Sequence, residues 1–265
     1  MNPANAAQTV AETVAGTENE KGNETTAAPV GGATPSRRPV SPYDNAFLTN
    51  VKDVTEVFLV RHGEQDIDHA ATAGELVDPP LSLRGRRQAE LVGERFARER
   101  IDVVYSSNLR RAHETGLAIA GHHGLPTIVD PLLREVEVFR DLPPDKTPLD
   151  ALGRRQLLGM RHRMQTEKRW DAYGFSESSA AFRSRVVTTI EGIIAEHPGE
   201  RIVIACHGGV IGTYTAHLLR IPEDMWFRPS HTSVNRILAK EGVRAIDFIG
   251  DVHHLKGADT SLVSY

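Results

Sequence analysis

The chain has 265 residues, of which 40% are hydrophobic and 25% are charged, and its formal net charge is −4. This balance is typical of an ordinary folded protein and argues against general nucleic-acid binding. A single cysteine, Cys206, excludes an internal disulfide framework and any zinc site built from cysteines.

The first 50 residues differ from the rest of the chain. They consist mainly of Ala, Thr, Glu, Asn, Gly and Pro, with very few bulky apolar residues before Phe47. Such a segment cannot bury enough apolar surface to offset its ordering entropy, so we expect residues 1–50 to be a disordered tail. We expect residues 51–265 to form one domain. The chain has neither a signal-peptide core nor an apolar run of membrane-spanning length, so we expect a cytoplasmic protein without a membrane partner.

Predicted strands and helices alternate along the domain. Short apolar runs predict strands at 55–61, 102–106, 127–130 and 201–206. Apolar residues at helical spacing predict helices at 82–99, 109–120, 180–196 and 209–220, with Ser82 and Asn108 as N-caps and Gly121 as a stop. Strands at 234–240 and 243–249 flank Glu241-Gly242 and predict a hairpin. This alternation predicts an α/β fold, a mainly parallel sheet sandwiched by helices in three layers.

Polar residues follow three of the predicted strands at the point where each strand ends. They are Arg61-His62-Gly63-Glu64 after 55–61, Ser107-Asn108-Leu109-Arg110-Arg111 after 102–106, and His207-Gly208-Gly209 after 201–206. Because α/β sheets bind ligands at the carboxyl ends of their strands, we expect His62, Arg111 and His207 to converge. A permanent cation beside an imidazole suits a phosphate group.

In this order the pieces resemble the histidine phosphatase superfamily, which has the phosphoglycerate mutase-like fold. The likeness covers residues 55–250 and also takes in Leu81-Ser82, Gly85, Gln88-Ala89, Thr115, Leu133-Arg134-Glu135 and Val210. The resemblance implies that residues 51–265 form a histidine phosphatase catalytic domain with that fold.

Three residues are the expected catalytic groups: His62, Glu135 and His207. As a neutral imidazole, His62 can accept the phosphoryl group and form a phosphohistidine, which divides one displacement into two easier ones. Glu135 follows Leu133-Arg134 as the family's acid–base glutamate does, and it would protonate the leaving oxygen. His207, when protonated, supplies a further charged donor.

We expect the substrate phosphate to bind at Arg61, Arg111, His207 and Gly208. The two guanidinium groups can hold phosphate oxygens through planar forks. Since these groups neutralise the phosphate themselves, we expect neither a metal nor another cofactor. We expect Arg110, the neighbour of Arg111, to point elsewhere.

The assignment of the acid–base group leaves alternatives. Glu137 lies two residues from Glu135, and Glu64 follows the His62 motif, where we expect it to orient the loop. Asp68 occupies the place of an asparagine that helps to hold phosphate in many relatives. An ionised carboxylate there must point away, be protonated or face a cationic substrate group.

Two other chemistries use residues of the same regions. Cys206 as a thiolate nucleophile would need an arginine six positions on, but position 212 is glycine. A metal cluster of His62, Asp66, Asp68 and His69 is the second alternative. The family resemblance explains His62 without a metal, and acidic loop residues are usually solvated.

The segment 136–180 is expected to cover the substrate. Residues 140–170 hold eight Lys/Arg against four Asp/Glu, and Phe139, Trp170 and Tyr173 are interleaved with them. The segment either attracts an anionic substrate or forms a solvated amphipathic helix.

The sequence therefore predicts a metal-independent phosphomonoesterase that acts through a phosphohistidine on a small phosphorylated metabolite. A cofactor-dependent phosphoglycerate mutase and a weakly active phosphate-ligand-binding relative are the alternatives. Asp68 and the missing glycine-rich stretch after Glu135 favour the phosphatase. Sugar phosphates, nucleotides and phosphoacids are all compatible as substrates, and the oligomeric state, a homodimer included, stays open.

Overall fold

A six-stranded mixed sheet runs through the domain, which extends from Val40 to Tyr265. The computed structural model describes residues 39–68 and 70–265. The strands lie in the order β3-β2-β4-β1-β5-β6, with the bounds β1 Thr55–Arg61, β2 Val103–Ser106, β3 Thr127–Val129, β4 Arg201–Cys206, β5 Val234–Lys240 and β6 Val243–Asp251. Strands β1 to β4 are parallel, and β5 and β6 form the predicted antiparallel hairpin.

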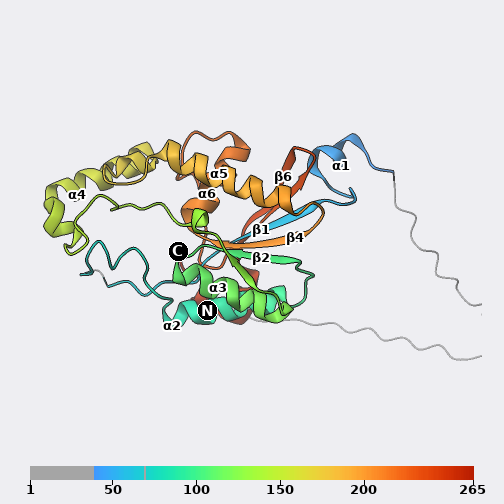
Figure 1. Cartoon of the computed structure of the whole chain (residues 1–265), viewed down its shortest axis with the longest axis horizontal. Helices are drawn as coiled ribbons and strands as arrows, with labels where there is room; N and C mark the ends of the chain where they lie inside the picture. The colour runs from blue at the N-terminus through green and yellow to red at the C-terminus, as the bar shows by residue number, and fades with distance from the viewer. Residues whose placement is uncertain (1–38, 69) are drawn as a thin grey trace, which may run out of the picture. The chain divides into compact units, whose positions relative to one another are not determined.

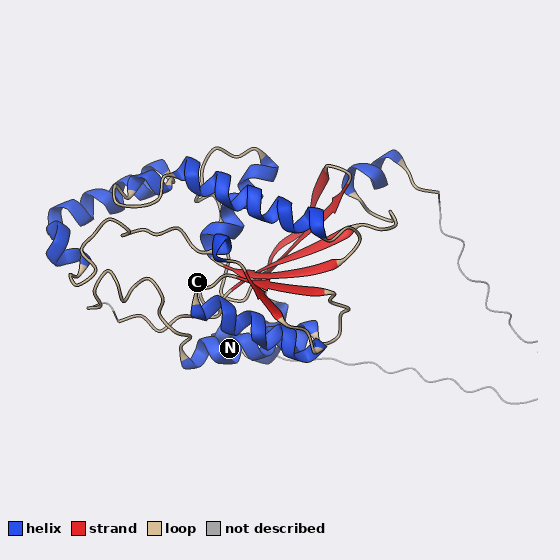
Figure 2. Ribbon diagram, in the orientation of Figure 1, coloured by secondary structure: helices blue, strands red, loops and turns tan. Residues whose placement is uncertain are grey.

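Helices cover both faces of this sheet (Figures 1 and 2). They are α1 (Pro42–Phe47), α2 (Leu83–Phe96), α3 (Arg110–Ala120), α4 (Pro148–Glu167), α5 (Ser179–Glu196), α6 (Gly208–Leu219) and α7 (His253–Ala258). Helices α2 and α3 lie against one face, and α5 and α6 lie against the other. The expected three-layer fold with a mainly parallel sheet is confirmed.

The side chains of β1 alternate between two cores. Val57 and Leu59 pack with residues of α5 and α6, whereas Phe58 and Val60 pack with residues of α2 and α3. Phe58 meets Phe96 of α2 edge to face, with ring centroids 5.3 Å apart. These four side chains of β1 are at most 1% exposed, so the burial of each contributes about 2 kcal/mol to the stability of the fold. The strand is therefore firmly held, and the residue that follows it is placed by the core.

The start of one helix differs from the prediction. The N-cap of α3 is Leu109, not Asn108, and it makes no side-chain cap bond. Instead, the Asp78 carboxylate, from another segment, accepts a hydrogen bond from the backbone N–H of Arg110 in the first turn at 2.8 Å. The Arg110 guanidinium donates to the Asp78 carbonyl at 2.7 Å, so Arg110 is engaged by Asp78, whereas Arg111 contacts His62. Helix α3 ends at Ala120 with Gly121 as its C-cap, as predicted, and a 3-10 turn then leads to Gly124, whose φ is 64°. Ser82 is the N-cap of α2, as predicted.

The predicted tail ends earlier than residue 50. Ser41 caps helix α1 through a capping box with Asp44, and Leu48 is buried against Leu238 and Ala245. Residues 40–50 therefore belong to the domain, because one buried leucine and a capped turn anchor a segment of otherwise polar composition. The prediction for residues 1–38 lies outside the described part of the chain.

Helix α4 lies in the segment expected to cover the substrate. It is broken at Gly153, whose φ is 73°, and Met160 is its buried residue. Its arginines are exposed, as in the solvated-helix alternative. Among the described residues, no helix is both long and apolar enough to cross a membrane.

Candidate active site

The parallel register brings the predicted site residues together. Arg61 lies opposite Cys206 across β1 and β4, so the next residues, His62 and His207, leave the sheet side by side. Their ring centroids are 5.1 Å apart, and both residues are at most 3% exposed. Arg111 reaches the same point from the first turn of α3.

His62 is held in one tautomer. Its Nδ1 lies 2.6 Å from the carbonyl oxygen of Gly63, and since a carbonyl only accepts, Nδ1 carries the proton. Nε2 therefore keeps the free lone pair, and Arg111 Nε donates to it over 3.3 Å. Gly63 is fixed in turn, because its N–H donates to Thr115 Oγ1 at 3.1 Å. The nitrogen that carries the free lone pair thus faces a guanidinium group.

The surroundings of both histidines favour the neutral imidazole. Burial lowers the pKa of His62 well below its ordinary 6.5, and the positive charges of Arg111 and Arg61 lower it further. Burial and the same two arginines lower the pKa of His207 in the same way. His207 Nε2 lies 2.9 Å from Ser107 Oγ, and its Nδ1 is buried without a partner among the described residues. A bound phosphate dianion would oppose these shifts and favour a protonated His207.

The arginines give the pocket its positive charge. Arg61 Nη1 donates to the Pro229 carbonyl at 2.6 Å, whereas its buried Nε has no partner among the described residues. Burial lowers the pKa of Arg61 to about 10 and also lowers that of Arg111. Gly208 begins α6 beside Arg61, where an added Cβ would lie 3.5 Å from Arg61 Nε. Buried cations with a free donor are suited to an anionic ligand.

Glu135 lies against the first turn of α6. Its Oε2 accepts from the Gly209 N–H at 3.0 Å, and its Oε1 accepts from the Val136 N–H at 3.0 Å. Its negative charge raises the pKa of both Arg61 and Arg111, against the effect of burial. The carboxylate is therefore close enough to act on both phosphate-binding candidates.

An ion pair fixes the loop that carries Glu135. Arg185 of α5 binds both carboxylate oxygens of Glu177, at 3.0 and 2.6 Å. Its Nη1 also donates to the carbonyls of Leu132 and Arg134, at 2.7 and 3.0 Å. These bonds hold the backbone immediately before Glu135, so Arg185 positions the carboxylate without touching it.

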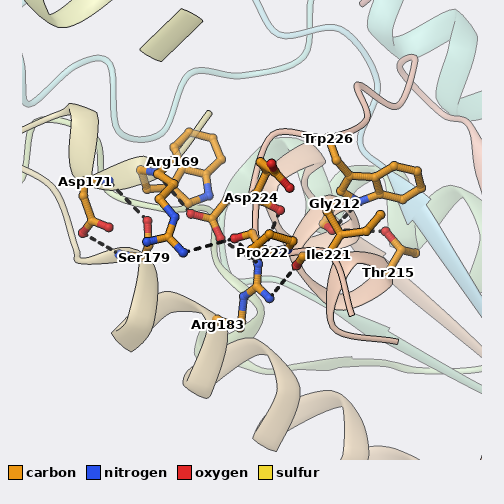
Figure 3. Close-up of polar contacts among 12 residues, drawn as sticks. Arg169, Asp171, Ser179, Arg183, Gly212, Thr215, Ile221, Pro222, Asp224 and Trp226 are labelled. Carbon is orange, nitrogen blue, oxygen red and sulfur yellow. Dashed lines mark hydrogen bonds and ion pairs between the residues drawn. The ribbon is translucent and has the colours of Figure 1, made fainter. Parts of the chain in front are cut away.

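The ring of Trp170 lies close to Gly209. A second polar cluster, in which Asp224 meets Arg183 and Asp171 meets Ser179, holds this residue (Figure 3). Asp224 accepts from the Trp170 N–H at 3.3 Å and from Arg183 Nη2 at 3.1 Å. Asp171 accepts from the Ser179 N–H at 3.0 Å. The end of the segment 136–180 is thereby tied to α5 and to the loop after α6.

The competing glutamates are engaged elsewhere. Glu64 accepts from Ser82 Oγ at 3.1 Å and from Arg84 at 3.1 Å, so it joins the His62 loop to the start of α2. Glu137 forms an ion pair with Arg134. Of these three carboxylates, Glu135 is therefore the one whose charge acts on both Arg61 and Arg111.

The remaining alternatives have less support. Asp68 is exposed and accepts from the Ala70 N–H at 2.8 Å, so it points into its own turn. His69 lies outside the described residues, and within the described ones no group of three or more His, Cys, Asp or Glu is arranged to hold a metal. Cys206 is fully buried, and burial raises the pKa of its thiol.

His231 is a site residue that the sequence reasoning missed. Its ring centroid lies 5.7 Å from that of His62, and the residue is 4% exposed. Its Nδ1 lies 2.9 Å from Ser264 Oγ, and its buried Nε2 has no partner in the described part of the chain. Burial, together with the charges of Arg61 and Arg228, lowers the pKa of His231 to about 3. The available signal was the polar run 230–233 directly before the strand predicted at 234–240.

Gln88 connects this third histidine to the His62 loop. Its Oε1 accepts from the Glu64 N–H at 2.8 Å, and its Nε2 donates to the Leu262 carbonyl at 2.6 Å and to Ser264 Oγ at 3.0 Å. Gln88 therefore braces the His62 loop against residues 262–264.

Known proteins share this sequence pattern and fold. The family model for the histidine phosphatase superfamily (branch 1) matches residues 57–252. The metal-independent phosphoserine phosphatase of Arabidopsis thaliana is 31% identical over 219 residues, which cover 77% of this chain and 84% of that protein. The phosphoglycerate mutase-like protein 4 of the same plant is 32% identical over 226 residues, covering 80% and 92%. The solved structure of Bacillus stearothermophilus YhfR aligns with a TM-score of 0.63 at 26% identity, covering 76% of this chain and 99% of that one. The chain belongs to the histidine phosphatase superfamily, branch 1.

Proposed function

We propose that this chain is a metal-independent phosphomonoesterase that acts through a phosphohistidine on His62. The observation that carries the proposal is the fixed tautomer of His62, with Nδ1 bonded to the Gly63 carbonyl and Nε2 directed at Arg111. Such an imidazole can attack phosphorus without first losing a proton. The similarity to a protein named as a phosphoserine phosphatase supports hydrolysis as the reaction.

In the first step, His62 Nε2 attacks the phosphorus, and the bond between phosphorus and the ester oxygen breaks. A protonated Glu135 gives its proton to that oxygen, so the leaving group departs as a neutral alcohol. Arg61 and Arg111 bind the equatorial oxygens, where charge accumulates in the transition state. The Gly63 carbonyl stabilises the Nδ1–H of the phosphohistidine.

In the second step, water attacks the phosphorus and the bond between phosphorus and Nε2 breaks. Glu135, now a carboxylate, accepts the proton of the attacking water. Inorganic phosphate leaves, His62 is again neutral, and Glu135 is again protonated. One glutamate thus serves as acid and then as base.

The alternative activity is that of a phosphoglycerate mutase, as the name of one relative suggests. A mutase must keep water from its phosphohistidine while the intermediate reorients. Glu135 here accepts hydrogen bonds from two backbone N–H groups. The sequence that follows Glu135 lacks the glycine-rich stretch found in mutases. This favours access for water and therefore hydrolysis.

The test is a panel of phosphate esters incubated with the chain in excess EDTA, with free phosphate measured. Phosphate release should continue after prolonged chelation. Orthovanadate should inhibit, because it mimics five-coordinate phosphorus. Loss of activity on chelation, restored by zinc or manganese, would contradict the metal-independent mechanism. Efficient primer-dependent conversion of 3-phosphoglycerate to 2-phosphoglycerate would favour the mutase instead.

A further inference from the structure

A cavity of about 370 Å³ opens beside the proposed phosphate site. It shares Arg111 and Glu135 with that site, and its other walls come from residues 73–77, Leu109, residues 134–144 and Tyr173. Two backbone bonds hold the walls together, from the Ala73 N–H to the Lys146 carbonyl at 2.8 Å and from the Gly74 N–H to the Pro144 carbonyl at 3.0 Å. A phosphate ester on Arg111 would direct its alcohol portion into this cavity, past Glu135.

The cavity is lined mainly by apolar side chains. They include Leu76, Val77, Leu109, Val138, Phe139 and Tyr173. Phe139 and Tyr173 meet edge to face, with ring centroids 6.2 Å apart, so the aromatic residues of the covering segment form a wall of the cavity. Val77 is 45% exposed at its edge, although valine side chains usually avoid water. An apolar ligand would remove this surface from water.

The charges of the cavity are already matched. Arg134 pairs with Glu137, and Arg140 pairs with Asp141 at 3.1 Å. Among the lining residues, all of which are described, the remaining charged ones are Arg111 and Glu135. Apart from Arg111, each lining cation therefore already has a carboxylate partner, with which a carboxylate or second phosphate of the substrate would have to compete. Burying such an anion without a partner is costly.

We propose that the preferred substrate is a phosphate monoester of an apolar alcohol, aliphatic or aromatic, whose carbon body fills this cavity. The proposal rests on the phosphomonoesterase function above. At about 30 Å³ for a water-sized group, the cavity holds on the order of ten non-hydrogen atoms. Esters whose alcohol portion carries charge, such as phosphoserine and 3-phosphoglycerate, are poor substrates on this basis.

The test compares straight-chain alkyl phosphates with two, four, six and eight carbons, using the full chain and measuring kcat/KM. The leaving alcohols have nearly the same basicity, so differences report burial of the chain. We expect kcat/KM to rise by roughly fourfold for each buried methylene until the cavity is full. At equal length, propyl phosphate should exceed both phosphoserine and 3-phosphoglycerate by at least about tenfold.

Two substitutions assign the effect to the cavity. Val138→Thr changes polarity at almost constant volume, and Val77→Asp changes the exposed edge, where the fold is least affected. Both should reduce the ratio of hexyl to ethyl phosphate turnover. The matched control is Leu158→Asp on α4, which is 54% exposed and outside the cavity and should leave the ratio unchanged. Melting temperatures verify that each variant is folded.

The outcomes separate the two proposals. A hexyl-to-ethyl ratio near one in the wild type, or a preference for phosphoserine, would overturn the apolar-substrate proposal while phosphate release still supports the phosphatase. Wild-type ratios in folded Val138→Thr and Val77→Asp would show that another surface binds the alkyl chain, which also overturns it. If no ester of any kind is hydrolysed, the proposed function itself fails.

Discussion

The substitution Gly209→Ala tests whether Glu135 acts from its position against the first turn of α6. An ideal Cβ on Gly209 would collide with Glu135 Oε1 and would lie 2.9 Å from Trp170 Cζ2. Trp170 is held by Asp224, so the flexible carboxylate is the group that must move. The substitution should therefore displace Glu135 while His62 and both arginines stay in place.

The expected loss follows from the bond that is broken. Displacement removes the hydrogen bond from the Gly209 N–H to the Glu135 carboxylate, which is worth about 1.5–3 kcal/mol. It also removes general acid–base catalysis, which typically contributes about 10²–10⁴-fold. We expect kcat for phenyl phosphate to fall by roughly 10²-fold or more. The fall for 4-nitrophenyl phosphate should be smaller, because nitrophenolate leaves without protonation.

The assay is steady-state phosphate release from these two aryl esters, which have similar shape and different leaving-group basicity. Gly192→Ala in α5 is the matched control, because no atom lies within 4 Å of its added Cβ. In a helix interior this control should raise stability by about 0.5–1 kcal/mol and leave both rates unchanged. The double variant Gly209→Ala/Glu135→Gln should be no slower than Glu135→Gln alone, since both changes disable one group. Wild-type rates on both esters in Gly209→Ala would refute this role of Glu135.

Two further predictions concern stability. The pKa of His231 in the folded chain, about 3, lies below its ordinary 6.5, so the unfolded chain binds the extra proton, and stability should fall as pH drops from 6.5 towards 3. The substitution His231→Asn should reduce the slope of unfolding free energy against pH by up to about 1.4 kcal/mol per pH unit, as measured by thermal melts. The exposed control His122→Asn should follow the wild type. A wild-type slope in His231→Asn would contradict the assignment. Deletion of residues 1–38 should leave the melting temperature unchanged. Deletion of residues 1–50 should lower the melting temperature, because this deletion removes the buried Leu48. Equal melting temperatures for both deletions would show that α1 does not stabilise the domain.

The sequence was sufficient for the fold and for the residues at strand ends. A buried strand followed by a polar residue predicts where that residue emerges, and this is why His62, Arg111 and His207 converge as expected. The alternation of strands and helices predicted the layers. The prediction of Asn108 as the N-cap of α3 was wrong, because Asp78, which is distant in the sequence, accepts the hydrogen bond of the first helical N–H group instead.

The missed features depend on contacts between distant segments. His231 lies near His62 where the loop before β5 is tied to Ser264 through His231 and to Arg61 through the Pro229 carbonyl. The apolar cavity is formed mainly by residues 73–77 and 134–144. These two segments are far apart in the sequence and have no periodic pattern of apolar residues that would predict their contact. The positive charge of residues 140–170 suggested an anionic ligand, but the α4 arginines are solvated and those lining the cavity away from the phosphate site are paired.

The central claim is that His62 carries the phosphoryl group, and acid quench of the enzyme during turnover of a phosphorus-labelled ester tests it most directly. The wild type should retain acid-labile, base-stable phosphate on the His62 peptide, as a phosphohistidine does. His62→Ala should retain none, lose turnover by several orders of magnitude and keep its melting temperature. Normal turnover in His62→Ala, or label on a residue other than His62, would contradict the account.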